Sequence, residues 1–90
     1  MAATRFVVHL TPSFQRDLES LALPLQTKVL REIKHLETNP FGPAPKIKKL
    51  KGGGVGQWRL QIWPYRVRYD VEGQDVALYR VRHRKDIYRE

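Results

Sequence analysis

Apolar residues follow two kinds of spacing in the first 39 residues of the chain. Residues 6–10 are apolar and partly β-branched, which predicts a strand. Thr11-Pro12 then offers a helix cap and a proline that suits the first helical position. Apolar side chains recur at helical spacing on both sides of Leu23-Pro24: Phe14, Leu18 and Leu21, then Leu25, Val29, Ile33 and Leu36. We expect a helical hairpin whose second helix ends at Thr38-Asn39-Pro40.

The second half of the chain alternates apolar and polar residues, as half-buried strands do. The apolar positions are Trp58, Leu60 and Ile62 of a first strand and Tyr65, Val67, Tyr69 and Val71 of a second. A tight turn at Trp63-Pro64 would pair Leu60 with Val67 and Trp58 with Tyr69. Residues 76–81 predict a last strand, which leads into a segment around His83 that we expect to form one short helical turn.

These elements predict an α+β fold, in which an N-terminal strand and a helical hairpin pack on a small twisted antiparallel sheet with a short C-terminal helical turn. A chain of 90 residues indicates a single domain over residues 1–90. The glycine-rich residues 52–56 lack the Gly-Lys-Ser/Thr ending of a phosphate-binding P-loop, so we interpret them as a turn between strands.

Charge and residue usage narrow the classes of function. Seventeen Lys and Arg against nine Asp and Glu give a net charge of +8, which indicates a polyanionic partner. The chain has no cysteine and its histidines lie far apart, at positions 9, 35 and 83, so we expect no metal site. Residues 1–5 do not begin a signal peptide, and no apolar stretch reaches about 18 residues. We therefore expect a cytoplasmic protein without a membrane segment.

Basic residues lie opposite one another on the exposed side of the predicted hairpin. Arg59 would face Arg68, and Gln61 would face Arg66, so that three guanidinium groups share that side. Like charges in such positions destabilise a sheet, by up to about 1 kcal/mol per pair. Something other than stability must favour them, and a phosphate ligand would do so.

Four motifs keep an order and spacing that resemble one family. They are Lys49-Leu50-Lys51-Gly52, Trp58-Arg59-Leu60, Tyr65-Arg66-Val67 and His83-Arg84-Lys85-Asp86-Ile87-Tyr88, preceded by a strand and two helices. In the order and spacing of these motifs, the chain resembles the RelE/ParE superfamily of bacterial and archaeal toxins. The resemblance covers nearly the whole chain and implies a compact, RelE-like α+β toxin domain.

The RelE branch of that superfamily consists of small basic endoribonucleases, or mRNA interferases, that cut messenger RNA in the ribosomal A site. The resemblance therefore implies attack of the RNA 2′-hydroxyl on the adjacent phosphate, which leaves a 2′,3′-cyclic phosphate and a 5′-hydroxyl. It implies no metal and no other cofactor. It also implies a cognate, RelB-like antitoxin that silences the toxin in a hetero-oligomer.

The same resemblance suggests a role for five residues. Arg59 and Arg66 would contact the scissile phosphate, and Arg84 would contact the phosphate or the leaving group. Tyr88 would stack on a base or orient the 2′-hydroxyl. His83 is the candidate general acid or base, because histidine has an unperturbed pKa of about 6.5. The arginines would instead stabilise negative charge.

Two departures from the family pattern leave alternatives open. Gln61 stands where many RelE enzymes carry a second basic residue, and Arg82 stands where a small residue is usual, so either Arg82 or Arg84 could point into the site. Side chains expected to bind RNA around this centre are Lys46, Lys48, Lys49, Lys51, Gln61, Arg68 and Arg82.

The leading hypothesis is thus an antitoxin-regulated, ribosome-dependent endoribonuclease that inhibits translation. The main alternative is a ParE-like toxin that poisons DNA gyrase without nuclease activity. A third reading is a catalytically inactive relative that binds RNA or antitoxin.

Overall fold

Helices and strands follow one another along residues 5–43, 45–51 and 56–85, the parts of the chain that this computed structural model describes. They are β1 Val7–Leu10, α1 Pro12–Glu19, α2 Leu23–Ile33, the 3₁₀ helix η1 Lys34–Glu37, β2 Ile47–Lys49, β3 Trp58–Ile62, β4 Tyr65–Glu72 and β5 Asp75–His83. The helical hairpin is confirmed. Its second helix begins earlier than expected, because Pro24 lies in the first turn, where a missing N–H costs no hydrogen bond.

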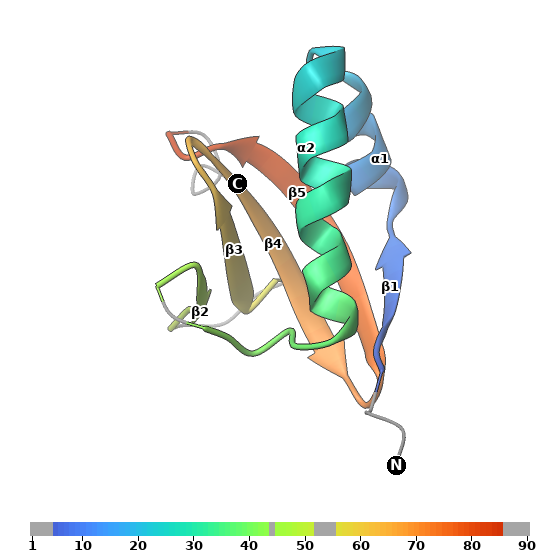
Figure 1. The fold of residues 1–90 in the computed structure, drawn as a ribbon, viewed down its shortest axis with the longest axis vertical. Helices are drawn as coiled ribbons and strands as arrows, with labels where there is room; N and C mark the ends of the chain where they lie inside the picture. Colours follow the sequence, from blue (N-terminus) through green and yellow to red (C-terminus); the bar gives the residue numbers. More distant parts are fainter. Residues whose placement is uncertain (1–4, 44, 52–55, 86–90) are drawn as a thin grey trace.

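The strands form one sheet in the order β1-β5-β4-β3-β2 (Figure 1). Neighbours from β5 to β2 are antiparallel, whereas β1 runs parallel to β5. The α+β class is therefore confirmed, but the sheet is mixed rather than antiparallel. The difference arises because the N-terminal strand hydrogen-bonds to β5 as an edge strand.

Both helices lie on the same face of the sheet and bury the core against it (Figure 1). The buried apolar side chains are Phe14, Leu18, Val29, Ile33 and Leu36 from the helical half, and Ile47, Leu60, Ile62, Val67, Tyr69, Val76, Leu78 and Val81 from the strands. The Tyr69 hydroxyl donates a hydrogen bond of 2.6 Å to the Pro40 carbonyl oxygen, and burial raises the pKa of this phenol. This hydrogen bond ties β4 of the sheet to the segment that follows η1.

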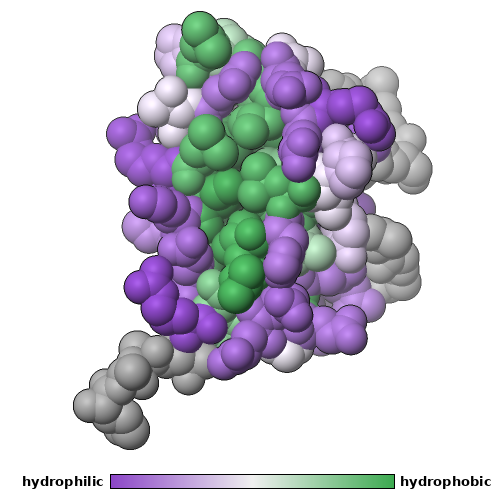
Figure 2. Space-filling view, turned by 90° about the vertical axis from the view of Figure 1, so that its right-hand side faces the viewer, coloured by the Kyte–Doolittle hydropathy of each residue, from purple (hydrophilic) through white to green (hydrophobic). Residues whose placement is uncertain are grey.

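The outer side of β1 and the helices is partly apolar. Figure 2 shows an apolar stripe along this side of the molecule, with hydrophilic residues on both borders. Val7 of β1 and Leu23 and Leu30 of α2 are large apolar side chains that remain exposed on these elements. None of the described helices is long and apolar enough to cross a membrane.

The β3–β4 register is the predicted one. Leu60 lies opposite Val67 and Trp58 opposite Tyr69. Trp58 itself is only partly buried, and it packs against the core and the Phe41 ring. Alternate residues of β3 and β4 therefore face the helices, and the residues between them face the other side of the sheet, which we call the open face.

A β-bulge in β5 decides which of its residues reach the open face. Arg68 pairs with Arg80 but Tyr69 pairs with Leu78, so Tyr79 is an extra residue on β5. One extra residue shifts the side-chain alternation by one position. As a result Leu78 and Val81 both face the core, and Arg80 faces away from it.

The expected helical turn near His83 is wrong for the described part of that segment. Residues 81–83 are strand, because β4 extends far enough to pair Tyr65 with His83 and Arg66 with Arg82. The Arg84 N–H then donates to the Pro64 carbonyl oxygen at 2.9 Å, which closes the end of the ladder. Residues 86–90, including the rest of the expected turn, lie outside the described residues.

Candidate functional site

Arginines occupy neighbouring positions of three strands on the open face. In one row, Arg68 of β4 lies between Arg59 of β3 and Arg80 of β5. In the next row, Arg66 lies between Gln61 and Arg82. We call the five guanidinium-bearing positions Arg59, Arg66, Arg68, Arg80 and Arg82 the arginine face. The cross-strand pairing inferred from the sequence is thus confirmed and continues onto β5.

Arg59 does not lie exposed as expected. It is only 7% accessible, and its Nη1 donates to Gln61 Oε1 at 2.6 Å and its Nη2 to the Pro45 carbonyl oxygen at 3.3 Å. The chain before β2 covers this guanidinium, so the expectation of three exposed arginines is wrong at this position. Gln61 accepts a hydrogen bond from Arg59, which leaves its amide N–H groups directed away from that contact.

Arg68 holds the start of β3 in place. Its Nε and Nη2 donate to the Gly56 carbonyl oxygen at 2.9 and 2.7 Å. Asp70 accepts from the backbone N–H groups of Gly56 and Gln57 at 3.0 and 2.6 Å. Gly56 has φ of +80°, and a Cβ there would come within 3.0 Å of the Arg68 Cβ, so glycine is required. Arg68, expected to bind RNA, is thus engaged in a backbone contact.

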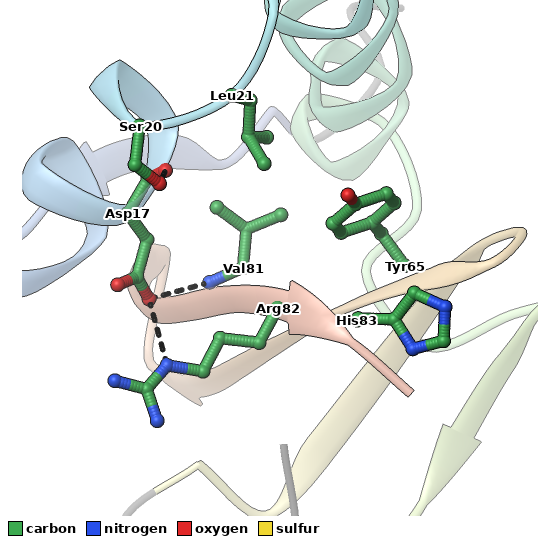
Figure 3. Close-up of a pocket in the computed structure, with 7 residues that line it drawn as sticks. All are labelled: Asp17, Ser20, Leu21, Tyr65, Val81, Arg82 and His83. Atoms are coloured by element: carbon green, nitrogen blue, oxygen red, sulfur yellow. Dashed lines mark hydrogen bonds and ion pairs between the residues drawn. The ribbon is translucent and has the colours of Figure 1, made fainter. Parts of the chain in front are cut away.

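Asp17 of α1 organises the edge of β5 beyond the end of β1. One of its carboxylate oxygens accepts from the Val81 N–H at 3.1 Å and from Arg80 Nε at 2.8 Å, and it lies 3.7 Å from Arg82 Nε (Figure 3). Thr11 and Ser13 donate to the Leu78 and Tyr79 carbonyl oxygens nearby. Because these side chains bond to the edge groups of β5, the C-terminal part of β5 has no open sheet edge there, although β1 has ended.

His83 lies apart from the arginine face. Like Val81, it lies on the side of β5 that faces the helices. Its ring meets the Tyr65 ring edge-on, with 5.6 Å between the ring centres. Figure 3 shows Leu21, Tyr65 and Val81 converging on this side of β5. Asp17, Ser20, Arg82 and His83 complete a cavity of about 550 Å³. The structure therefore brings Gln61, Arg66 and Arg82 together on the open face and places the His83 ring on the helix side, at the end of β5.

Hydrogen bonding assigns the two nitrogens of the His83 ring. The Lys85 backbone N–H donates to His83 Nδ1 at 3.2 Å. A neutral imidazole that accepts at Nδ1 carries its proton on Nε2. In this arrangement Nε2 is a hydrogen-bond donor, and the lone pair of Nδ1 is occupied by the Lys85 contact.

The four lysines expected to bind RNA divide between two sides. Lys48 pairs with Arg59 and extends the arginine row onto β2. Lys49, the next residue, lies on the opposite side of β2, and its Nζ lies 5.9 Å from the centre of the Trp58 ring. Lys46 forms an ion pair with Glu32 of α2, which lowers the pKa of that carboxyl. Lys51 is exposed beyond β2, so these four lysines do not share one side of the sheet.

The opposite end of the open face is acidic. Asp70, Glu72 and Asp75 surround a cavity of about 490 Å³ with Ala77 and Tyr79. Partial burial and the neighbouring Asp70 and Glu72 carboxylates raise the pKa of Tyr79. The open face is therefore polar along its length, with cations toward the β3–β4 turn and carboxylates toward the β4–β5 turn.

Arg84 lies at the cationic end and stacks on the ring of Trp63, with its guanidinium carbon 4.8 Å from the ring centre. Tyr88, the remaining predicted site residue, lies outside the described residues. Among residues 5–43, 45–51 and 56–85, no group of three or more His, Cys, Asp and Glu side chains could hold a metal ion.

Sequence reasoning missed Asp17, Tyr65 and Trp63 as parts of this site. An acidic residue among apolar helical positions gives no sign of its distant partners, so no local signal identifies Asp17. Tyr65 was assigned to the core because it keeps step with Val67. Trp63 did carry a signal, because turns favour Gly, Asn, Asp and Pro over a large aromatic residue.

Comparison with a family model gives a match over most of the chain. The model is described as the ParE toxin of the type II toxin–antitoxin system parDE, and it matches residues 8–88. A search of curated proteins gave no match.

Three solved structures, from three organisms, have a similar fold. The toxin–antitoxin complex RelBE2 of Mycobacterium tuberculosis matches with a TM-score of 0.76 and 24% identity over 89% of this chain and 99% of that chain. The RelB–RelE antitoxin–toxin complex of Methanococcus jannaschii matches with a TM-score of 0.67 and 27% identity over 89% and 94%. A copper-bound mutant toxin of Helicobacter pylori matches with a TM-score of 0.62 and 20% identity over 92% and 99%. Because the M. tuberculosis and H. pylori structures are only 24% and 20% identical to this chain, their likeness concerns the fold alone.

Proposed function

We propose that this chain, which belongs to the ParE toxin family of type II toxin–antitoxin systems, is a toxin that cleaves messenger RNA on the ribosome, in the cytoplasm. The resemblance to the RelE/ParE superfamily is confirmed by the family match and the toxin structures. The observation that carries the proposed activity is the arginine face, where guanidinium groups lie in register across β3, β4 and β5. Arg59, Arg68, Arg80 and Arg82 have partners within the protein, but five guanidinium groups on one face still attract a polyanionic ligand.

The chemistry would be an intramolecular phosphoryl transfer within the RNA. The 2′-hydroxyl loses its proton and attacks the adjacent phosphorus, the bond from phosphorus to the 5′-oxygen breaks, and that oxygen takes up a proton. The pentacoordinate intermediate carries extra negative charge, which guanidinium groups stabilise without giving up their own protons. Arg66 and Arg84 are the groups that we assign to this task.

The neighbouring residues have supporting roles in the proposal. Arg59 orients Gln61 through their 2.6 Å hydrogen bond, so Gln61 can donate its amide N–H groups to the RNA. His83 Nε2 offers a further donor near the strand end. Tyr88 keeps its predicted role in stacking or in orienting the 2′-hydroxyl.

Expression of the chain in cells tests the proposed activity. We expect growth arrest together with messenger RNA cuts inside reading frames that leave 5′-hydroxyl ends. Arg66→Ala should relieve both effects, whereas Arg16→Ala, which removes an exposed arginine of α1, should relieve neither. Growth arrest with intact transcripts would contradict the proposal.

A second candidate function is gyrase poisoning, and one observation favours it. Arg59, expected to contact the scissile phosphate, is buried and bonded within the protein, so one expected phosphate ligand is withdrawn. Purified gyrase and supercoiled DNA separate the candidates. A gyrase poison traps DNA breaks in this assay, and an RNA endonuclease leaves the DNA unbroken.

We also propose a cognate antitoxin with an acidic segment that covers the arginine face. The solved relatives from M. tuberculosis and M. jannaschii are complexes of this kind. An acidic, disordered segment that folds on binding suits the arginine face of a chain whose net charge is +8. Co-expression of this chain with the product of a neighbouring acidic reading frame should restore growth and give a hetero-oligomer.

A further inference from the structure

Trp63 occupies an unusual place, at the exposed β3–β4 turn. Its side chain is 57% accessible, which makes it one of the most exposed large apolar residues of the described chain. An indole this exposed gains only part of the stability that full burial would give, and the turn does not require it. Its position therefore calls for a reason other than folding.

The Arg84 guanidinium lies over the Trp63 ring. The guanidinium carbon lies 4.8 Å from the ring centre, and the Arg84 backbone N–H donates to the carbonyl oxygen of Pro64, the residue next to Trp63. The two contacts fix Arg84 to the turn through both its backbone and its side chain. An indole and a guanidinium thus lie together at the cationic end of the open face.

A shallow cavity of about 230 Å³ adjoins the same ring, lined by Trp63, Gln61, Pro45 and Lys46. It is smaller than the roughly 300–1,000 Å³ of pockets for drug-sized ligands, so it suits one planar ring system. Its lining combines apolar rings with the Gln61 amide, which both donates and accepts hydrogen bonds. These are the groups that recognise the face and the edge of an unstacked base.

We infer that Trp63 is a stacking platform for one RNA base, which enters the cavity beside Gln61 while Arg84 binds the phosphate next to that base. The inference rests on the proposed RNA cleavage and adds a base subsite to it. Aromatic side chains stack on bases of single-stranded nucleic acid irrespective of sequence, and a nearby cation adds affinity. Trp63 would accordingly contribute to substrate binding, and the Gln61 amide to the choice of base.

Cleavage of messenger RNA on programmed ribosomes tests the inference, with the purified full chain as enzyme. The variants are Trp63→Leu, which removes the ring, and Trp63→Phe, which keeps a smaller ring. Phe41→Leu is the matched control, because Phe41 is also an exposed aromatic residue, at 49%, but lies against Phe6 and Trp58. Melting temperatures establish that each variant is folded, and Trp63→Gln replaces Trp63→Leu if the latter is not.

Loss of one stacked base predicts that Trp63→Leu raises KM roughly 5- to 150-fold and changes kcat less. Trp63→Phe should recover most of the loss, and Phe41→Leu should resemble the unchanged protein. Equal losses in Trp63→Leu and Trp63→Phe, or no loss in either while the unchanged chain cleaves, would overturn the base subsite alone. If the unchanged chain leaves the RNA intact, the proposed function and the subsite both fail.

Discussion

Arginine serves two different purposes in this sheet. Arg59 and Arg68 bond to the Pro45 and Gly56 carbonyl oxygens and thereby hold the chain around β2 and β3. Arg66 lies in the same alternation, in the row nearer the β3–β4 turn. Periodicity predicts the face of each arginine but gives no information on which loop carbonyl will reach it.

The two kinds of arginine should respond differently to truncation. Arg66→Ala should lower the cleavage rate by about 10²- to 10³-fold, because it removes a group that stabilises transition-state charge. Arg68→Ala should instead lower the free energy of unfolding by about 1.5–3 kcal/mol, because it removes charged hydrogen bonds to Gly56. Single-turnover cleavage and denaturant unfolding of both variants check this, and equal effects on cleavage would argue against the distinction.

His83→Gln should reduce cleavage less than Arg66→Ala does. Its Nδ1 accepts from Lys85, and its ring lies with Tyr65 on the helix side of the sheet. Glutamine retains donors but cannot titrate, so the pH dependence of the cleavage rate is the informative measurement. We expect the pH profile of the variant to keep its shape. Loss of a limb near neutral pH would establish His83 as a proton-transfer group.

At the scale of elements, the edge between α1 and β5 and the bulge at Tyr79 do most to shape the site. The bulge directs Arg80 and Arg82 away from the core, and Asp17 then binds both at the strand edge. Without the extra residue, Arg80 would take the buried side of Leu78. The site thus depends on one irregularity in an otherwise regular sheet.

Asp17→Asn should destabilise the fold by about 1–3 kcal/mol. The carboxylate is mostly buried, accepts hydrogen bonds from Val81 and Arg80 and forms an ion pair with Arg82, and an amide keeps only part of this capacity. Glu19→Gln is the matched control, since Glu19 is exposed on the same helix. Thermal unfolding of both variants provides the comparison. Equal stabilities would show that Asp17 does not secure α1 to β5.

Acid should weaken the link between α2 and the chain before β2. The hydrogen bond and charge of Lys46 lower the pKa of Glu32 from its ordinary value of 4.5, so the folded state binds this proton less readily than the unfolded state. The stability from the pair is present above that value and declines as the pH falls through the lowered pKa. Glu32→Gln should therefore show a shallower loss of stability below about pH 4.5, measured by unfolding at a series of pH values. An unchanged slope would contradict the assignment.

The elements themselves were largely predictable. Helical spacing located the hairpin, and alternation located β3 and β4 with their register, because both patterns reflect burial on one side. The parallel partner of β1 was not predictable, since pairing over such a long sequence separation leaves no local pattern. The apolar positions Val76, Leu78 and Val81 did indicate the bulge, because they are spaced by two and then three residues, whereas a regular strand keeps a spacing of two. The segment after β5 was assigned to a helix because its partner in β4 could not be seen.

At the scale of the whole molecule, charge is distributed along the open face. The arginine face lies toward the β3–β4 turn, and Asp70, Glu72 and Asp75 lie toward the β4–β5 turn. A polyanion is attracted to the first and repelled by the second, so the proposed RNA substrate would be oriented by the charge of the fold itself. Trp63 and Arg84 mark the end at which that strand would meet the site.

The most direct test of the central claim is the chemistry of the ends made by the purified chain on ribosomes that carry a defined messenger RNA. We predict a cut in the A-site codon that leaves a 2′,3′-cyclic phosphate upstream and a 5′-hydroxyl downstream, and its loss in Arg66→Ala. Intact messenger RNA after incubation with the folded chain, or 5′-phosphate ends at the cut, would contradict the account.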